Sequence, residues 1–199
     1  NTQPAILAAS IAILRPLERR GLSAEAAAGH SLGEYTAITA AGGFALKDAI
    51  ALVQKRGRYM QEAMPEGAGL MAAILGMDRA GLEKTCLDAA KNGIVAPANY
   101  NSPGQIVIAG EKKAVEKAME LAKAAGARKV VPLMVSVPSH CSLMKQAGER
   151  LARDLDTVTI NDLRIPIMNN ADAKFLRTAA ELGLEKSERR SYLEMLLLK

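Results

Sequence analysis

The sequence predicts a mixed α/β protein built in two parts, and three observations carry that prediction. Segments whose apolar residues recur at helical spacing alternate along the chain with short apolar runs typical of strands. Residues Gly29-His30-Ser31-Leu32-Gly33 have the Gly-x-Ser-x-Gly pattern of a sharp strand-to-helix turn that exposes a nucleophilic serine. Between residues 65 and 135 the apolar segments follow the order β-α-β-β-α-β, which is the ferredoxin-like arrangement. We therefore expect a ferredoxin-like domain inserted into the domain that carries the serine.

The part that surrounds the serine is expected to be mainly helical. Apolar spacing and helix-ending glycines predict helices over residues 4–20, 32–41, 45–64 and 143–155. Short strands are predicted over residues 24–30 and 165–168, and a loop should begin at Asn169 and Asn170. Residues from about 174 onward are charged and helix-prone.

The inserted part has predicted strands at residues 70–75, 94–100, 105–109 and 130–135, with helices at 79–91 and 111–125. An RNA-binding domain shares this order of elements, but it carries stacking aromatic residues on its central strands. The segment Gln105-Ile106-Val107-Ile108-Ala109 contains none. RNA recognition is therefore disfavoured.

Composition excludes several other classes. Hydrophobic residues make up 49% of the 199 residues, yet no apolar run reaches the length of about 18 that a membrane span needs. The N-terminus lacks a signal-peptide pattern, so we expect a cytoplasmic protein without a membrane partner. Aromatic residues make up 3% and Trp is absent, which disfavours nucleic acid. The net charge of +5 favours an acidic or phosphate-bearing partner.

Two cysteines, Cys86 and Cys141, form neither a disulfide framework nor a metal-ligand spacing, so reduced thiols are expected and no metal site is predicted.

Ser31 has two competing interpretations. As the centre of the strained turn it is a nucleophile, and a side chain in place of Gly29 or Gly33 should clash with the neighbouring strand or helix. Alternatively, Ser31 and Glu34 form the Ser-x-x-Glu capping box of the following helix. Two flanking glycines favour the nucleophile, because a helix cap requires neither.

Three further groups have the chemistry to assist such a serine. His140 follows a predicted strand in a polar turn and is the candidate base, the alternative being an ordinary loop histidine. The backbone N–H of Leu32 is a candidate donor to an oxyanion. Arg56 falls within the apolar stripe of the helix at 45–64, so it is either a clamp for a substrate carboxylate or a side chain that reaches out to solvent.

Four motifs then occur in a characteristic order: Gly29-His30-Ser31-Leu32-Gly33-Glu34-Tyr35, Gln54-Lys55-Arg56-Gly57, Asn99-Tyr100-Asn101-Ser102-Pro103-Gly104-Gln105 and Val135-Ser136-Val137-Pro138-Ser139-His140. Together they resemble the malonyl-CoA:acyl carrier protein transacylase family, over residues 2 to about 170.

This resemblance implies an α/β-hydrolase-like large subdomain, residues 1–64 and 136–199, with a ferredoxin-like small subdomain, residues 65–135. It implies transfer of malonyl from malonyl-CoA to the phosphopantetheine thiol of acyl carrier protein by a monomer that needs neither metal nor cofactor. Ser31 would be the nucleophile and His140 the base. Arg56 would hold the malonyl carboxylate, with Leu32 and Gln3 also in the substrate site.

The sequence departs from the family at both ends. The family's N-terminal segment, which supplies a second oxyanion donor, is absent before Asn1, and residues 174–199 do not resemble the part that orients the histidine. The resemblance thus implies an incomplete chain, for which weak or no catalysis is expected. Three alternatives stay open: a serine esterase or thioesterase, a polyketide synthase acyltransferase domain, and an inactive fragment that only binds.

Overall fold

The computed structural model describes residues 1–135, 137–171 and 173–182, and it has a mixed α/β architecture. Ser136 and residues 183–199, including most of the predicted C-terminal helical stretch, lie outside that range. Contacts divide the chain into two compact units. Among the described residues, one unit contains residues 1–59 and those from 148 to 182, and the other contains residues 60–147. The predicted subdomain boundaries at 64/65 and 135/136 stay a prediction.

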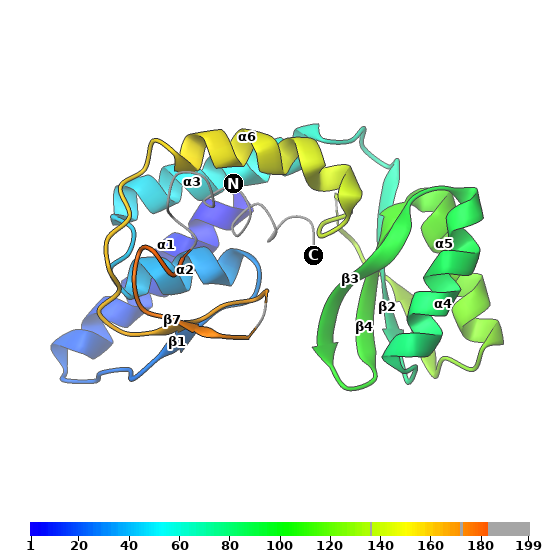
Figure 1. Ribbon diagram of the computed structural model, residues 1–199, viewed down its shortest axis with the longest axis horizontal. Helices are drawn as coiled ribbons and strands as arrows, with labels where there is room; N and C mark the ends of the chain where they lie inside the picture. The colour runs from blue at the N-terminus through cyan, green and yellow to red at the C-terminus, as the bar shows by residue number, and fades with distance from the viewer. Residues whose placement is uncertain (136, 172, 183–199) are drawn as a thin grey trace. The chain divides into compact units, whose positions relative to one another are not determined.

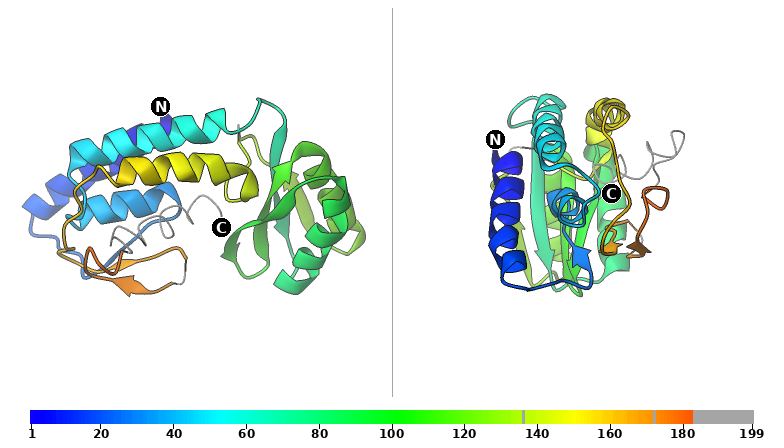
Figure 2. Two further views of the ribbon diagram at one scale, coloured as in Figure 1. Left: turned by 45° about the horizontal axis from the view of Figure 1, so that its top comes forward. Right: turned by 90° about the vertical axis from the view of Figure 1, so that its left-hand side faces the viewer.

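The first unit is mainly helical, as predicted (Figure 1). It contains α1 (Thr2–Arg19), α2 (Leu32–Ala40), most of α3 (Leu46–Glu62) and most of α6 (Lys145–Leu155). Figure 2 shows α3 and α6 running side by side, and Asp154 of α6 joins them by accepting hydrogen bonds from Lys55 and Tyr59 of α3.

A small sheet completes the first unit, with the strand order β1 (Ala27–Ala28), β6 (Ile167–Met168), β7 (Phe175–Leu176). The β1–β6 pair is parallel and the β6–β7 pair is antiparallel. The predicted strand at 24–30 is reduced to two alanines, which have low strand propensity. The helical tendency predicted from residue 174 is wrong at β7, because pairing with β6 overrides local propensity there.

The second unit has the predicted order of elements. Its strands are β2 (Gly69–Leu75), β3 (Val95–Ser102), β4 (Gln105–Glu111) and β5 (Lys129–Pro132), and its helices are α4 (Arg79–Ala89) and α5 (Lys112–Ala124). Short 3-10 turns, η1 (Ala90–Asn92) and η2 (Ser142–Met144), follow α4 and precede α6. The sheet order is β3-β4-β2-β5, and every neighbouring pair is antiparallel.

The sheet of the second unit is packed on both faces. Helices α4 and α5 cover one face (Figure 1), where Ile74 and Ile108 of the sheet pack against Leu82 and Val115. On the other face Met71 and Val107 pack against Cys141. Because alternate residues of a strand point to opposite faces, the continuous apolar runs of β2 and β4 reflect this burial on both sides.

None of the helices within the described part of the chain is long and apolar enough to cross a membrane.

Candidate functional site

Ser31 occupies the predicted turn between β1 and α2. Its backbone has φ 55° and ψ −105°, so it is one of the few residues other than glycine with a positive φ. Such a conformation costs on the order of 1–3 kcal/mol and persists only where the surroundings enforce it. This strained strand-to-helix turn, the elbow (residues 29–33), confirms the turn geometry that the pentapeptide predicts.

The two glycines of the elbow are not equivalent. A Cβ built on Gly29 would overlap the backbone carbonyl of Gly33, so any side chain at Gly29 forces the main chain apart. A Cβ on Gly33 would point into open space, with nothing within 4 Å apart from its chain neighbours and the backbone of its own helix. The prediction of a clash is confirmed for Gly29, whose Cβ would point at the Gly33 carbonyl. It is wrong for Gly33, whose Cβ would point into open space.

The capping-box interpretation is wrong. Ser31 makes no side-chain cap hydrogen bond to the start of α2, and its hydroxyl instead accepts a hydrogen bond from Arg56. Glu34, which would complete the box, is fully buried and accepts a hydrogen bond from the Asn170 backbone N–H at 3.1 Å. Both side chains therefore bond to distant parts of the unit.

Arg56 lies in the apolar face of α3 with 2% of its surface exposed, which contradicts the solvent-reaching alternative. Its Nη2 donates to Ser31 Oγ at 3.0 Å and its Nη1 donates to Gln3 Oε1 at 2.6 Å. The guanidinium carbon lies 5.5 Å from the centre of the Tyr35 ring. Three helices thus bring Arg56, Gln3 and the start of α2 to the same place.

Burial lowers the pKa of Arg56, while neighbouring Tyr35 favours its charged form. Burial also raises the pKa of Tyr35 to about 12, so this neighbour is a neutral phenol at physiological pH. A guanidinium keeps its charge in proteins even when buried. The side chain is therefore a fixed cation in a low-dielectric setting.

No ion pair within the described residues includes Arg56, and its Nε is buried without a hydrogen-bond partner there. Taking such a cation out of water costs several kcal/mol unless an anion compensates it, so uncompensated ones are rare. The planar fork of a guanidinium matches a carboxylate in particular. The arrangement is suited to receive a carboxylate beside the Ser31 hydroxyl.

Leu32 is the first residue of α2, and its backbone N–H donates no hydrogen bond to any described residue. It directly follows the serine and lies at the positive end of the helix dipole. The role of this N–H as a donor to an oxyanion stays a prediction.

His140 lies in the second unit, whereas Ser31, Arg56 and Gln3 lie in the first. Its exposed fraction is 6% and its φ is 62°. The turn around it is anchored within that unit: the Cys141 thiol donates to Pro138 O at 3.1 Å, and Pro138 packs so closely on β2 that a Cβ on Gly69 would overlap it. His140 is thus a buried turn histidine, and its pairing with Ser31 stays a prediction. The other histidine, His30, is exposed.

Sequence reasoning missed Asn170. Its side chain accepts a hydrogen bond from Ser31 N at 2.6 Å and donates one to Gly29 O at 2.7 Å. The signal that could have found it is its position directly after a predicted strand, since polar residues at strand ends form sites in α/β sheets.

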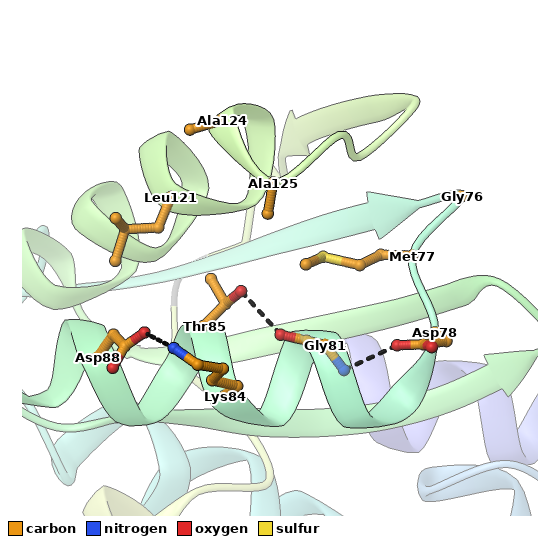
Figure 3. Close-up of a pocket in the computed structure, with 10 residues that line it drawn as sticks. All are labelled: Gly76, Met77, Asp78, Gly81, Lys84, Thr85, Asp88, Leu121, Ala124 and Ala125. Carbon is orange, nitrogen blue, oxygen red and sulfur yellow. Dashed lines mark hydrogen bonds and ion pairs between the residues drawn. The ribbon is translucent and has the colours of Figure 1, made fainter.

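The second unit also contains a cavity of about 570 Å³ between α4 and α5 (Figure 3). Its polar groups are already paired with one another: Asp78 accepts from the Gly81 N–H, Thr85 donates to Gly81 O, and Lys84 pairs with Asp88. Groups that are satisfied in this way do not converge on a ligand, so the Ser31 region is the better candidate site. Among the residues that the structure describes, no group of three His, Cys, Asp or Glu side chains could hold a metal ion.

A serine in a strained strand-to-helix turn is typical of proteins that transfer or hydrolyse acyl groups. Comparison with known families agrees, because the model of the acyl transferase domain matches residues 1–180. The chain belongs to this acyl transferase family.

Individual relatives are more specific. The chain is similar to the malonyl CoA-acyl carrier protein transacylase of Escherichia coli K12, with 53% identity over 175 residues, which is 87% of this chain and 57% of the relative. A malonyl-transacylase solved in complex with a type II PKS acyl-carrier protein matches all of this chain and 62% of its own, with a TM-score of 0.93 and 47% identity. An acyl carrier protein S-malonyltransferase from Vibrio cholerae O1 matches all of this chain and 63% of its own, with a TM-score of 0.91 and 46% identity. The chain therefore spans about three-fifths of the length of these relatives.

Proposed function

We propose that this protein transfers a malonyl group from malonyl-CoA to the phosphopantetheine thiol of acyl carrier protein, through a malonyl ester on Ser31, in fatty acid synthesis. The observation that carries the proposal is the buried Arg56, which donates to Ser31 Oγ and has no carboxylate partner among the described residues. Relatives whose names state this activity, at 53% identity, support it.

In the first half-reaction Ser31 Oγ attacks the thioester carbonyl carbon of malonyl-CoA, and His140 accepts the hydroxyl proton. The carbonyl oxygen becomes an oxyanion, which the Leu32 N–H stabilises. As the tetrahedral intermediate collapses, the carbon–sulfur bond breaks and His140 returns its proton to the CoA thiolate. Ser31 is left as a malonyl ester.

The second half-reaction runs the same steps with a new nucleophile. His140 accepts the proton of the carrier-protein thiol, whose sulfur attacks the ester carbonyl, and the proton passes to Ser31 Oγ as it leaves. Only acyl and proton transfers occur, and we propose that neither a metal nor a redox cofactor takes part.

Arg56 selects acyl groups that carry a free carboxylate. With Nη1 held by Gln3, the guanidinium can turn Nη2 from the Ser31 hydroxyl to the free carboxylate of malonyl, and the paired charges hold the acyl group in place. A neutral acyl group would leave the buried cation uncompensated. This favours malonyl transfer over the esterase and thioesterase alternatives. We propose that Gln3 acts through Arg56.

The family resemblance implies a finer description of the fold, which we propose for this chain. We propose an α/β-hydrolase-like subdomain around the elbow, supported by the parallel β1–β6 pair and the strand-turn-helix at Ser31. A ferredoxin-like small subdomain is supported by the β3-β4-β2-β5 antiparallel sheet. The net charge of +5 suits an acidic carrier protein, and we propose that the protein acts as a cytoplasmic monomer.

The direct test is incubation of the chain with malonyl-CoA, followed by intact-mass measurement. We expect a mass increase of one malonyl group, none in Ser31→Ala, and loading at least about 100-fold slower in His140→Ala. Transfer is then read from the appearance of malonyl on holo acyl carrier protein. An adduct that persists in Ser31→Ala would contradict the proposal, and so would wild-type loading in His140→Ala.

A further inference from the structure

Asn170 lies two residues beyond the end of β6, beside the elbow. Strands β1 and β6 are parallel, with Ala27 opposite Ile167 and Ala28 opposite Met168. The carboxyl ends of parallel neighbours meet at the same edge of a sheet. Extending the same register past both strand ends places Asn170 opposite His30, the second residue of the elbow.

The side chain of Asn170 continues the hydrogen bonding of the sheet across this gap. In a parallel pair, one residue bonds through its N–H and C=O to the residues before and after the one opposite it. Here the Asn170 side-chain amide makes those two bonds: Nδ2 donates to Gly29 O at 2.7 Å, and Oδ1 accepts from Ser31 N at 2.6 Å. The amide group has one donor and one acceptor where the elbow needs them.

Because its side chain takes the bonds of the ladder, the Asn170 backbone N–H can bond elsewhere. It donates to Glu34 Oε2 at 3.1 Å, and Glu34 is fully buried in α2. Asn170 therefore bonds to the chain at three points: Gly29 before the serine, Ser31 itself, and Glu34 about one helical turn after it. These contacts span 136 to 141 residues of sequence.

We propose that Asn170 is a positioning residue that holds Ser31 in its strained, positive-φ conformation and so fixes the location of the nucleophilic Oγ. The expected effect on malonyl loading rests on the proposed function. The claim that Asn170 holds the Ser31 backbone rests on the hydrogen bonds alone. Without these bonds the elbow relaxes toward an ordinary helix start and Oγ moves away from its line of attack. Misplacement by about 1 Å can slow a reaction on the order of 100-fold.

The test compares Asn170→Ala and the isosteric Asn170→Asp with wild type. The alanine variant loses both side-chain bonds, whereas the aspartate keeps an acceptor for the Ser31 N–H and cannot donate to Gly29 O when ionised. We expect malonyl loading at saturating malonyl-CoA to fall by about tenfold or more in both variants, while the half-saturating concentration changes less than about twofold because Arg56 is untouched. The Ser31 amide proton, followed by NMR, should exchange with solvent faster in Asn170→Ala.

Asn169→Ala is the matched control. Asn169 is the preceding residue, and its side chain accepts a hydrogen bond from the Lys174 N–H within its own loop. If Asn170 served only to stabilise the loop, this control would slow loading by a similar factor and the proposal would fail. Unchanged loading or unchanged Ser31 amide exchange in Asn170→Ala would also overturn it. If the wild-type chain loads no malonyl, the proposed function fails, whereas the amide-exchange measurement still decides the role of Asn170.

Discussion

Arg56 places a buried positive charge next to the hydroxyl of Ser31. Its spacing on α3 left two interpretations open, a carboxylate clamp and a side chain that reaches solvent. Sequence reasoning could not decide between them, because the partners of Arg56 lie 25 and 53 residues away. In the structure it bonds both Ser31 and Gln3 from a buried position. We propose that a hydroxyl with such a neighbour accepts acyl groups that carry a free carboxylate.

Gln3 should control the affinity for malonyl through Arg56. Gln3→Ala removes the acceptor from Nη1, and loss of one hydrogen bond to a charged group predicts an increase of about tenfold in the malonyl-CoA concentration that half-saturates loading. Gln3→Glu should impair loading more strongly, because the new carboxylate pairs with Arg56 and repels that of the substrate. The measurement is the rate of adduct formation against malonyl-CoA concentration.

Gln54→Glu is the control for this charge change. It puts the same carboxylate on an exposed position of α3, and loading should be unaffected. If Gln3→Glu loads malonyl as well as Gln54→Glu does, then Gln3 does not act on Arg56.

At the level of elements, the elbow was the part most accessible from sequence. Two glycines around a serine predicted the turn, and the structure confirms its geometry. The sequence could not distinguish the roles of the glycines, because the clash at Gly29 comes from the path of the backbone at Gly33.

Substitution of the two glycines should therefore have opposite outcomes. In Gly29→Ala the added methyl group overlaps the Gly33 carbonyl, so we expect the Ser31 adduct to form at least about 100-fold more slowly than in wild type. Gly33→Ala should remain folded and load malonyl, because its Cβ points into open space beside its own helix and alanine is the better helix former by about 1 kcal/mol. Intact mass gives the loading and thermal melting gives the stability. Equal loss in both variants would contradict this account of the turn.

Helices α3 and α6 are held together by Asp154, which accepts from Lys55 Nζ at 2.6 Å and from Tyr59 Oη at 2.7 Å. Partial burial raises the pKa of Asp154, but the hydrogen bonds from Lys55 and Tyr59 outweigh it and hold the pKa below its usual value. A carboxyl with a lowered pKa stabilises the fold above its unfolded-state pKa of about 3.9, and that stability is lost as the pH falls through the folded-state value.

We therefore expect Asp154→Asn to lower the free energy of unfolding by about 1 kcal/mol at neutral pH, a modest figure because Lys55 is partly screened by solvent. The difference from wild type should shrink toward zero in strong acid. Urea unfolding at both pH values measures it. Asp88→Asn is the control, because its pair with Lys84 on α4 is exposed, and it should leave the unfolding free energy nearly unchanged. A constant difference at all pH values would contradict the assignment to Asp154 ionisation.

Over the whole molecule, sequence reasoning predicted the elements of the second unit better than those of the first. The apolar runs of β2 and β4 are unambiguous, because both faces of that sheet are buried. The sheet of the first unit consists of two-residue strands such as Ala27–Ala28, whose existence depends on pairing with residues 140 positions away. Contacts of that range, including those of Asn170, are set by the folded chain and leave little local signal.

The central claim is that the Arg56–Ser31 pair selects acyl groups that carry a carboxylate. The most direct measurement is the rate of Ser31 adduct formation from malonyl-CoA and from acetyl-CoA, in wild type and in Arg56→Ala, with thermal melting to show that the variant is folded. We predict that wild type prefers malonyl and that Arg56→Ala loses malonyl loading by about 100-fold or more while acetyl loading is retained or increased. Equal loss of both reactions in a folded Arg56→Ala would contradict the claim.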